Sequence, residues 1–184
     1  MRDYKLTAEM KQVLKPILEE TIRKDESRVS PLVYCAMAPL EDLCIPPQEA
    51  DTDVMQWVED GVHSVKVRQD ETSYLLFLDL LHDCMTAGGA FVIPVVEENG
   101  QRIWGALGRA ANEVWLPVFT SMEKAQHWLA DDQFQLIPME DAIMRAAALQ
   151  PVTGMVFNPL ADDILVYVDA LQHLSGEFLL ANCV

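Results

Sequence analysis

Residues 91–119, FVIPVVEENGQRIWGALGRAANEVWLPVF, hold three apolar runs separated by polar and glycine-containing turns. The first run leads to Asn99-Gly100, a dipeptide that accepts the positive φ angles of a tight type I′ turn. The first two runs therefore predict a β-hairpin, and residues 114–119 predict a third strand. Pro94 has no amide hydrogen, so its strand is expected at a sheet edge or distorted at that residue.

Downstream of this meander, short apolar runs alternate with helical patterns. Strands are expected at residues 134–137, 155–157 and 164–166, and helices at 121–130, from Pro138 onward and at 169–174. Gly176 is expected just past the end of the last helix. Thr120-Ser121-Met122-Glu123 reads as a capping box with Thr120 as the helix cap. The order of elements predicts an α+β fold, in which helices pack on a mixed, mostly antiparallel sheet.

Upstream, residues 73–85 predict a largely buried helix that starts at Asp70 or Thr72. A short helix is expected before it, from Asp51 or Thr52 to a C-terminal cap at Gly61, followed by a strand at 62–67.

Two regions follow from this pattern. Residues 1–70 are interpreted as an N-terminal part, with a helix at 7–24 and a proline-rich segment at 29–50 packed on the same domain. Residues 71–184 are interpreted as the α+β domain.

The composition limits the possible partners. The 184 residues include 29 acids and 13 bases, a net charge of −16, and 51% of them are hydrophobic. Such a chain can form a core, but its charge repels phosphate backbones, so no nucleic-acid partner is expected. An acidic surface suits a basic protein instead. No 18-residue window is free of charge, so membrane insertion is not expected.

The N-terminal residues do not resemble a secretory signal, and a cytoplasmic location is therefore expected. In a reducing compartment the four cysteines are interpreted as free thiols, packed as small apolar side chains; they are Cys35, Cys44, Cys84 and Cys183.

No motif for nucleotide, metal or nucleophilic chemistry is found in the chain. His82 and Cys84 stand two residues apart on a predicted helix, so they do not share a face. His63, His127 and His173 have no spacing that recommends them. No catalytic residue, metal or cofactor is therefore predicted, and a non-enzymatic role is favoured while enzymatic activity stays open.

Three motifs together resemble the SseB protein N-terminal domain family. They are Phe91-Val-Ile-Pro-Val, Trp115-Leu-Pro-Val-Phe-Thr-Ser and Gly154-Met-Val-Phe-Asn-Pro, and the similarity spans roughly residues 73–174. Members of this family are bacterial and their activity is poorly defined. The resemblance thus implies an accessory or interaction role, and it supplies no catalytic residue. Residues 1–70 have no assigned counterpart in the family.

Two functional hypotheses follow. The first is an interaction or regulatory module with a basic protein partner, whose interface lies on residues 29–50, at Leu32, Val33, Tyr34, Met37 and Leu40. The same segment could instead pair two copies of the chain. The second hypothesis is a small-ligand-binding protein or enzyme. Its site would lie at the two turns of the motifs, if both turns are at one end of the sheet; these residues are Phe119, Thr120, Ser121, Asn158 and Pro159. A purely structural role for both turns is the simpler interpretation.

Overall fold

The computed structural model describes residues 32–33, 51–98, 100–108, 113–126, 134–149 and 151–182. Predictions elsewhere lie outside the described residues. These are the helix at 7–24, most of segment 29–50 with Tyr34, Met37 and Leu40, and the side chains of Asn99, His127, Cys35, Cys44 and Cys183.

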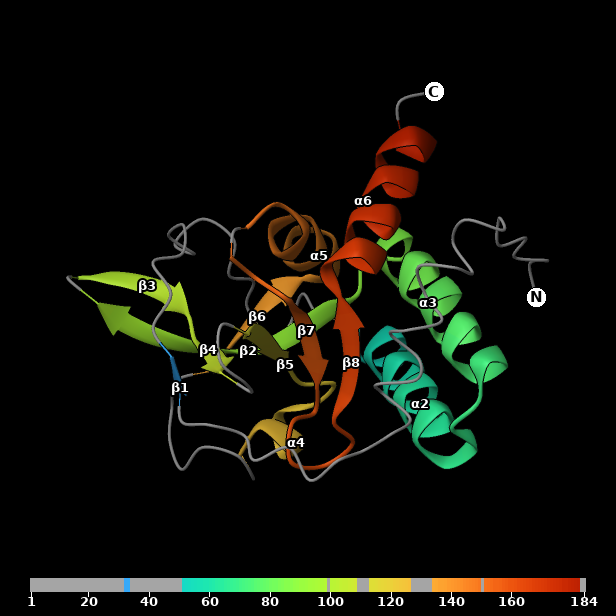
Figure 1. Ribbon diagram of the computed structural model, residues 1–184, viewed down its shortest axis with the longest axis horizontal. Coiled ribbons are helices and arrows are strands. Elements are labelled where there is room, and N and C mark those ends of the chain that lie inside the picture. Colours follow the sequence, from blue (N-terminus) through green and yellow to red (C-terminus); the bar gives the residue numbers. More distant parts are fainter. Residues whose placement is uncertain are drawn as a thin grey trace.

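The described strands form two sheets (Figure 1). The larger has the order β1 (Leu32–Val33), β4 (Ala106–Gly108), β5 (Val114–Val118), β7 (Gly154–Phe157) and β8 (Ile164–Tyr167). Only β5 and β7 are parallel within it. The smaller sheet, with the order β3 (Gln101–Trp104), β2 (Ala90–Glu98) and β6 (Phe134–Pro138), is antiparallel. The α+β prediction, with mostly antiparallel strands, is confirmed.

The predicted hairpin joins β2 to β3. Glu98 pairs with Gln101, and Gly100 has a φ of 77°, as a tight turn requires. β2 is the central strand of its sheet, and its pairing changes at Pro94. Residues up to Pro94 pair with β6, whereas Val95 and those after it pair with β3. The strand is therefore irregular where proline lacks its donor.

The two sheets are joined where the end of β5 reaches β2. The amide of Val92 donates to the carbonyl of Phe119 at 3.1 Å, and the amide of Phe119 donates to the carbonyl of Val92 at 2.8 Å. Phe119 is completely buried, as expected for the end of a core strand.

One prediction upstream is wrong. Residues 52–68 form a single helix, α2 (Thr52–Arg68), so neither a stop at Gly61 nor a strand at 62–67 is present. The valines that resembled a strand recur at helical spacing and are all buried: Val54, Val58, Val62 and Val65. Gly61 lies where α2 crosses α3 (Glu71–Thr86), and an added Cβ would come within 2.9 Å of the Phe77 ring. Helix packing, rather than chain termination, accounts for this glycine.

The remaining helices are α4 (Met122–Gln126), α5 (Met139–Ala148) and α6 (Val168–Asn182). Pro138 precedes α5, as expected. The prediction that the last helix ends before Gly176 is wrong, because α6 continues through this residue. Gly176 is exposed, and a glycine in a helix interior costs only about 1 kcal/mol relative to alanine, which the rest of the helix can offset.

Helices α2, α3, α5 and α6 enclose the core together with the sheets (Figure 1). The ring of Phe157 on β7 makes T-shaped contacts with Phe77 on α3, at 5.2 Å between centroids, and with Phe91 on β2, at 5.4 Å. Cys84 is buried in the same core, and burial raises the pKa of its thiol to about 12. That thiol is therefore protonated and packs as a small apolar group.

Helix α3 also makes a hydrogen bond to the outer strand β8. The hydroxyl of the fully buried Tyr74 donates to the carbonyl of Leu165 at 2.7 Å. A side chain thus satisfies a main-chain acceptor on a strand that pairs with β7 alone in the described sheet. Burial raises the pKa of Tyr74 well above its ordinary value, which keeps this donor protonated.

Candidate functional site

The β5–α4 turn and the β7–β8 loop meet at one end of the larger sheet. Strands β5 and β7 are parallel neighbours, so their C-terminal ends lie side by side. The amide of Thr120 donates to Oδ1 of Asn158 at 2.9 Å, and the amide of Asn158 donates to the carbonyl of Val118 at 2.8 Å. Two of the sequence motifs are therefore in direct contact.

Asn158 organises the β7–β8 loop. It is completely buried with a φ of 47°, a left-handed conformation that asparagine tolerates better than most residues. Its carbonyl accepts bonds of 3.0 to 3.1 Å from the amides of Ala161, Asp162 and Asp163. Its Nδ2 donates to Oγ1 of Thr120 at 3.0 Å and to Oδ2 of Asp162 at 2.8 Å. One amide side chain thus connects the two turns.

The prediction that Thr120 caps helix α4 is wrong. The amide of Lys124 donates to Oγ of Ser121 at 3.3 Å, which makes Ser121 the capping residue. Thr120 is 2% exposed, and its hydroxyl donates to Oε2 of Glu59 at 3.2 Å. Because the Thr120 hydroxyl is hydrogen-bonded to Glu59 and Asn158, the next residue, Ser121, caps the helix instead.

Two lysines share one buried carboxylate beneath these turns. Nζ of Lys124 is 2.5 Å from Oδ2 of Asp162, and Nζ of Lys66 is 3.2 Å from its Oδ1. The Asp162 side chain is only 6% exposed. Lys66 also donates to the carbonyl of Ala161, and Lys124 lies 3.5 Å from Oε1 of Glu59. These contacts fasten α2 to both turns.

The electrostatics keep Asp162 and Lys124 ionised at neutral pH. Burial raises the pKa of Asp162, but hydrogen bonds from Lys124 and Asn158 and the charge of Lys124 outweigh it, so the pKa is lowered overall. Burial likewise opposes the charge of Lys124, yet Asp162 and Glu59 raise its pKa overall. Both groups are therefore charged partners in a structural network.

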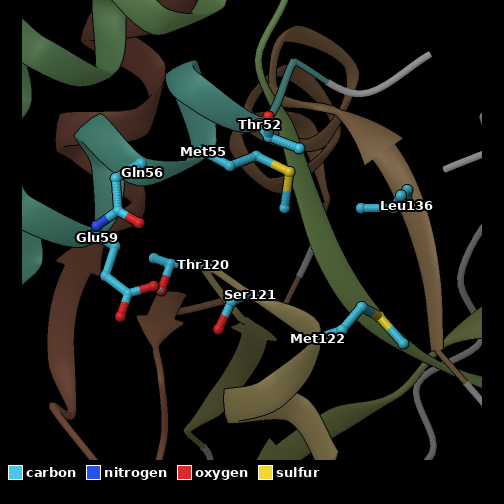
Figure 2. Close-up of a pocket in the computed structure, with 8 residues that line it drawn as sticks. All are labelled: Thr52, Met55, Gln56, Glu59, Thr120, Ser121, Met122 and Leu136. Carbon is cyan, nitrogen blue, oxygen red and sulfur yellow. Dashed lines mark hydrogen bonds between the residues drawn. The ribbon is translucent and has the colours of Figure 1, made fainter. Parts of the chain in front are cut away.

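A hollow of about 290 Å³ lies beside this cluster (Figure 2). Its walls come from α2, the β5–α4 turn and β6: Thr52, Met55, Gln56, Glu59, Thr120, Ser121, Met122 and Leu136. Figure 2 shows Met55, Met122 and Leu136 toward one side and Gln56 and Glu59 toward the other. The hollow thus has an apolar side and a polar side, and Met122 is 43% exposed at its rim.

The predicted site residues lie in three different places in the structure. Thr120 and Ser121 line the hollow, whereas Asn158 and Pro159 are buried in the adjacent loop and do not line it. Leu32 and Val33 form β1 and pair with Leu107 and Ala106 of β4.

Sequence reasoning missed Glu59, Lys66 and Asp162, the groups that connect α2 to the turns. Glu59 and Asp162 stand in acidic doublets typical of solvated positions. Nothing local signals that they converge, because their partners lie tens of residues away along the chain.

Histidine and metal chemistry receive no support from the described part of the chain. His63 is exposed, His82 and His173 are half-buried, and none of the three lines the hollow. Within the same described ranges, no three His, Cys, Asp or Glu side chains are arranged to hold a metal ion. The helices of the described chain also lack the combination of length and apolar character that crossing a membrane demands.

Residues 62–172 match the SseB protein N-terminal domain, which is more than half of the chain, and the chain belongs to this family. The match begins inside α2 and includes both turns. No curated protein matches the chain, and no solved structure matches it. The α2 wall of the hollow, from Thr52 to Glu59, precedes the matched residues. The hollow therefore combines family motifs with a segment outside the match.

Proposed function

We propose that this chain is a non-enzymatic accessory or regulatory module of the bacterial cytoplasm that acts by binding another protein at the hollow. The observation that carries the proposal is the two-sided hollow between α2 and the family's β5–α4 turn. Family membership supports an accessory role but assigns no partner, so the proposal depends on the chemistry of this surface.

The polar groups behind the hollow are already committed to one another. Asp162 receives two lysines and an asparagine amide, and Thr120 is bonded to Glu59 and Asn158. Groups held this way position loops, whereas a general base needs a lone pair directed at a substrate proton. The cluster is therefore suited to hold the hollow open in a defined shape.

The apolar side of the hollow suits a protein contact. Methionine side chains are unbranched and polarisable, so they adapt to partners of different shape. Met55 and Met122 both face this space, and Met122 is partly exposed (Figure 2). A contact here would bury apolar surface that is now open to water.

A photo-reactive residue at Met122 tests the proposal in living host cells. Substitution of Met122 by p-benzoylphenylalanine is expected to give a defined cross-linked protein adduct under illumination. The control is the same substitution at Val67, which is 65% exposed in the last turn of the same helix that forms the hollow's wall. Adducts absent at both positions, or equal at both, would contradict the proposal.

The segment 29–50 is proposed as a second contact or as a homodimer interface. Its Leu32 and Val33 pair with β4 and form the outer strand of the larger sheet. The edge of a sheet is where a strand of a partner chain can add by main-chain hydrogen bonds. Replacing Tyr34, Met37 and Leu40 by serine in the full chain should weaken self-association measured by sedimentation. An unchanged sedimentation coefficient over a wide concentration range would refute the dimer.

A small-ligand site is the second candidate, because the hollow reaches the Thr120 turn. Its volume of about 290 Å³ is at the lower end of ligand pockets, which run from roughly 300 to 1,000 Å³. A ligand that raises the Tm of the native chain but not of Met122→Trp, which fills the rim, would favour this candidate.

A further inference from the structure

We propose that the hollow receives an arginine side chain of the protein partner, with its methylene stem against Met55, Met122 and Leu136 and its guanidinium near Glu59. This inference rests on the proposed function and names the chemistry of the partner's anchor. The division of the hollow into an apolar side and a polar side is the observation behind it (Figure 2).

The shape of the lining matches an amphipathic side chain. Long cationic residues bury their methylene groups on apolar surface while the charged end reaches polar partners. Here the thioethers of Met55 and Met122 and the Leu136 side chain supply the apolar surface. A purely apolar anchor would make no polar contact with Glu59, which is bonded to Thr120 and lies 3.5 Å from Lys124 but stays partly exposed.

The charge at the polar end favours a cation. Besides Glu59, helix α2 with its cap and the adjacent β7–β8 loop carry the carboxylates of Asp51, Asp60 and Asp162. Asp60 accepts a bond of 3.0 Å from Gln56, and Asp51 caps α2 directly before Thr52. Two ammonium groups, Lys66 and Lys124, balance only part of this charge. An incoming cation is thus attracted, and an incoming carboxylate is repelled.

Glu59 is the acceptor best placed to hold the cation. Lys124 lies 2.5 Å from Asp162 but 3.5 Å from Glu59, so its ammonium group is committed chiefly to Asp162. The Glu59 side chain keeps 27% of its surface exposed, against 6% for Asp162. Arginine suits this acceptor better than lysine, because its planar group offers five donors to the Glu59 carboxylate, the Gln56 carbonyl and the nearby hydroxyls.

Methyl-labelled methionine provides the test. The chain has nine methionines, and those at 55 and 122 can be assigned by Met55→Leu and Met122→Leu. The full-length protein is titrated with the peptide acetyl-Gly-Ala-Arg-Ala-Gly-amide, and with versions carrying citrulline or norleucine in place of arginine. Citrulline keeps the shape of arginine without its charge.

We expect the arginine peptide to shift the methyl signals of Met55 and Met122 saturably. Glu59→Gln, which retains an acceptor for Thr120, should weaken binding about tenfold, the equivalent of about 1.4 kcal/mol. Glu71→Gln removes the same charge from the exposed first turn of α3 and should change the affinity less than twofold. Unchanged signals of the other methionines show that each variant is folded.

The outcomes separate the two proposals. Norleucine or citrulline peptides that bind as tightly as the arginine peptide would overturn the arginine anchor, and so would an affinity that Glu59→Gln leaves unchanged. An excess of the arginine peptide that leaves the methyl signals of Met55 and Met122 unshifted would also overturn it. In each case a cross-link from Met122 would still support protein binding at the hollow, and its absence would refute that function independently.

Discussion

Replacing Asn158 by alanine is expected to remove a large part of the stability of the domain. The substitution deletes the acceptor for the Thr120 amide and the donor to Asp162. An unsatisfied buried amide costs about 1–3 kcal/mol, and a hydrogen bond to a charged group contributes about 1.5–3 kcal/mol. The φ of 47° adds about 1 kcal/mol for alanine. We therefore expect a total loss of about 3.5–7 kcal/mol.

Urea unfolding followed by tryptophan fluorescence measures this loss, because Trp104 and Trp115 are completely buried. Asn158→Gly is the matched control, since it removes the same hydrogen bonds but tolerates the positive φ. It should be no less stable than Asn158→Ala despite the greater flexibility of its unfolded chain. A loss below about 1 kcal/mol for Asn158→Ala, at an unchanged m value, would refute the role assigned to this residue.

Three further predictions concern other contacts. Tyr74→Phe should destabilise the chain by about 0.5–1.5 kcal/mol in urea, because the hydrogen bond from the buried Tyr74 hydroxyl to the Leu165 carbonyl is lost; an unchanged midpoint would contradict this. Gly154→Ala should be strongly destabilising in a thermal melt, since its Cβ would meet the Val166 carbonyl and approach Cα of Tyr167 to 2.8 Å; a Tm equal to that of the native chain would show that the strands can separate there. Because the pKa of Asp162 is lowered in the folded chain, the ionised side chain stabilises the fold at pH values above the ordinary aspartate pKa. This stabilisation is lost as the pH falls through the lowered pKa. The stability difference between the native chain and Asp162→Asn should therefore narrow in acid, and a constant difference from pH 7 to pH 2 would contradict the assignment.

The local patterns of the chain predicted most elements correctly. The hairpin at Gly100, the buried helix after Asp70 and the turn at Asn158 each depend on residues close together in sequence. A dipeptide that accepts positive φ, or a side chain that caps its own helix, carries its physical cause with it. Such features can be read from a single sequence, and so can the α+β class that their order defines.

Two of the failures, at Gly61 and Thr120, occurred where a distant partner decided the outcome. Gly61 matches a helix end locally, yet α2 continues through it to Arg68. A glycine stands there because a side chain at that crossing would collide with α3. Thr120 matches a helix cap, yet Glu59 and Asn158 compete for its hydroxyl and Ser121 becomes the cap. In both cases a long-range contact outweighed a local preference.

The sequence by itself determined the fold class, the family motifs and the acidic character of this protein, because periodicity, turn chemistry and charge are properties of neighbouring residues. Only the tertiary structure decided that Glu59, Thr120 and Asp162 converge and that a two-sided hollow forms beside them. Glu59 and Thr120 are separated by 61 positions in the chain. Their contact depends on how α2 packs across the ends of β5 and β7, and no local pattern encodes that packing.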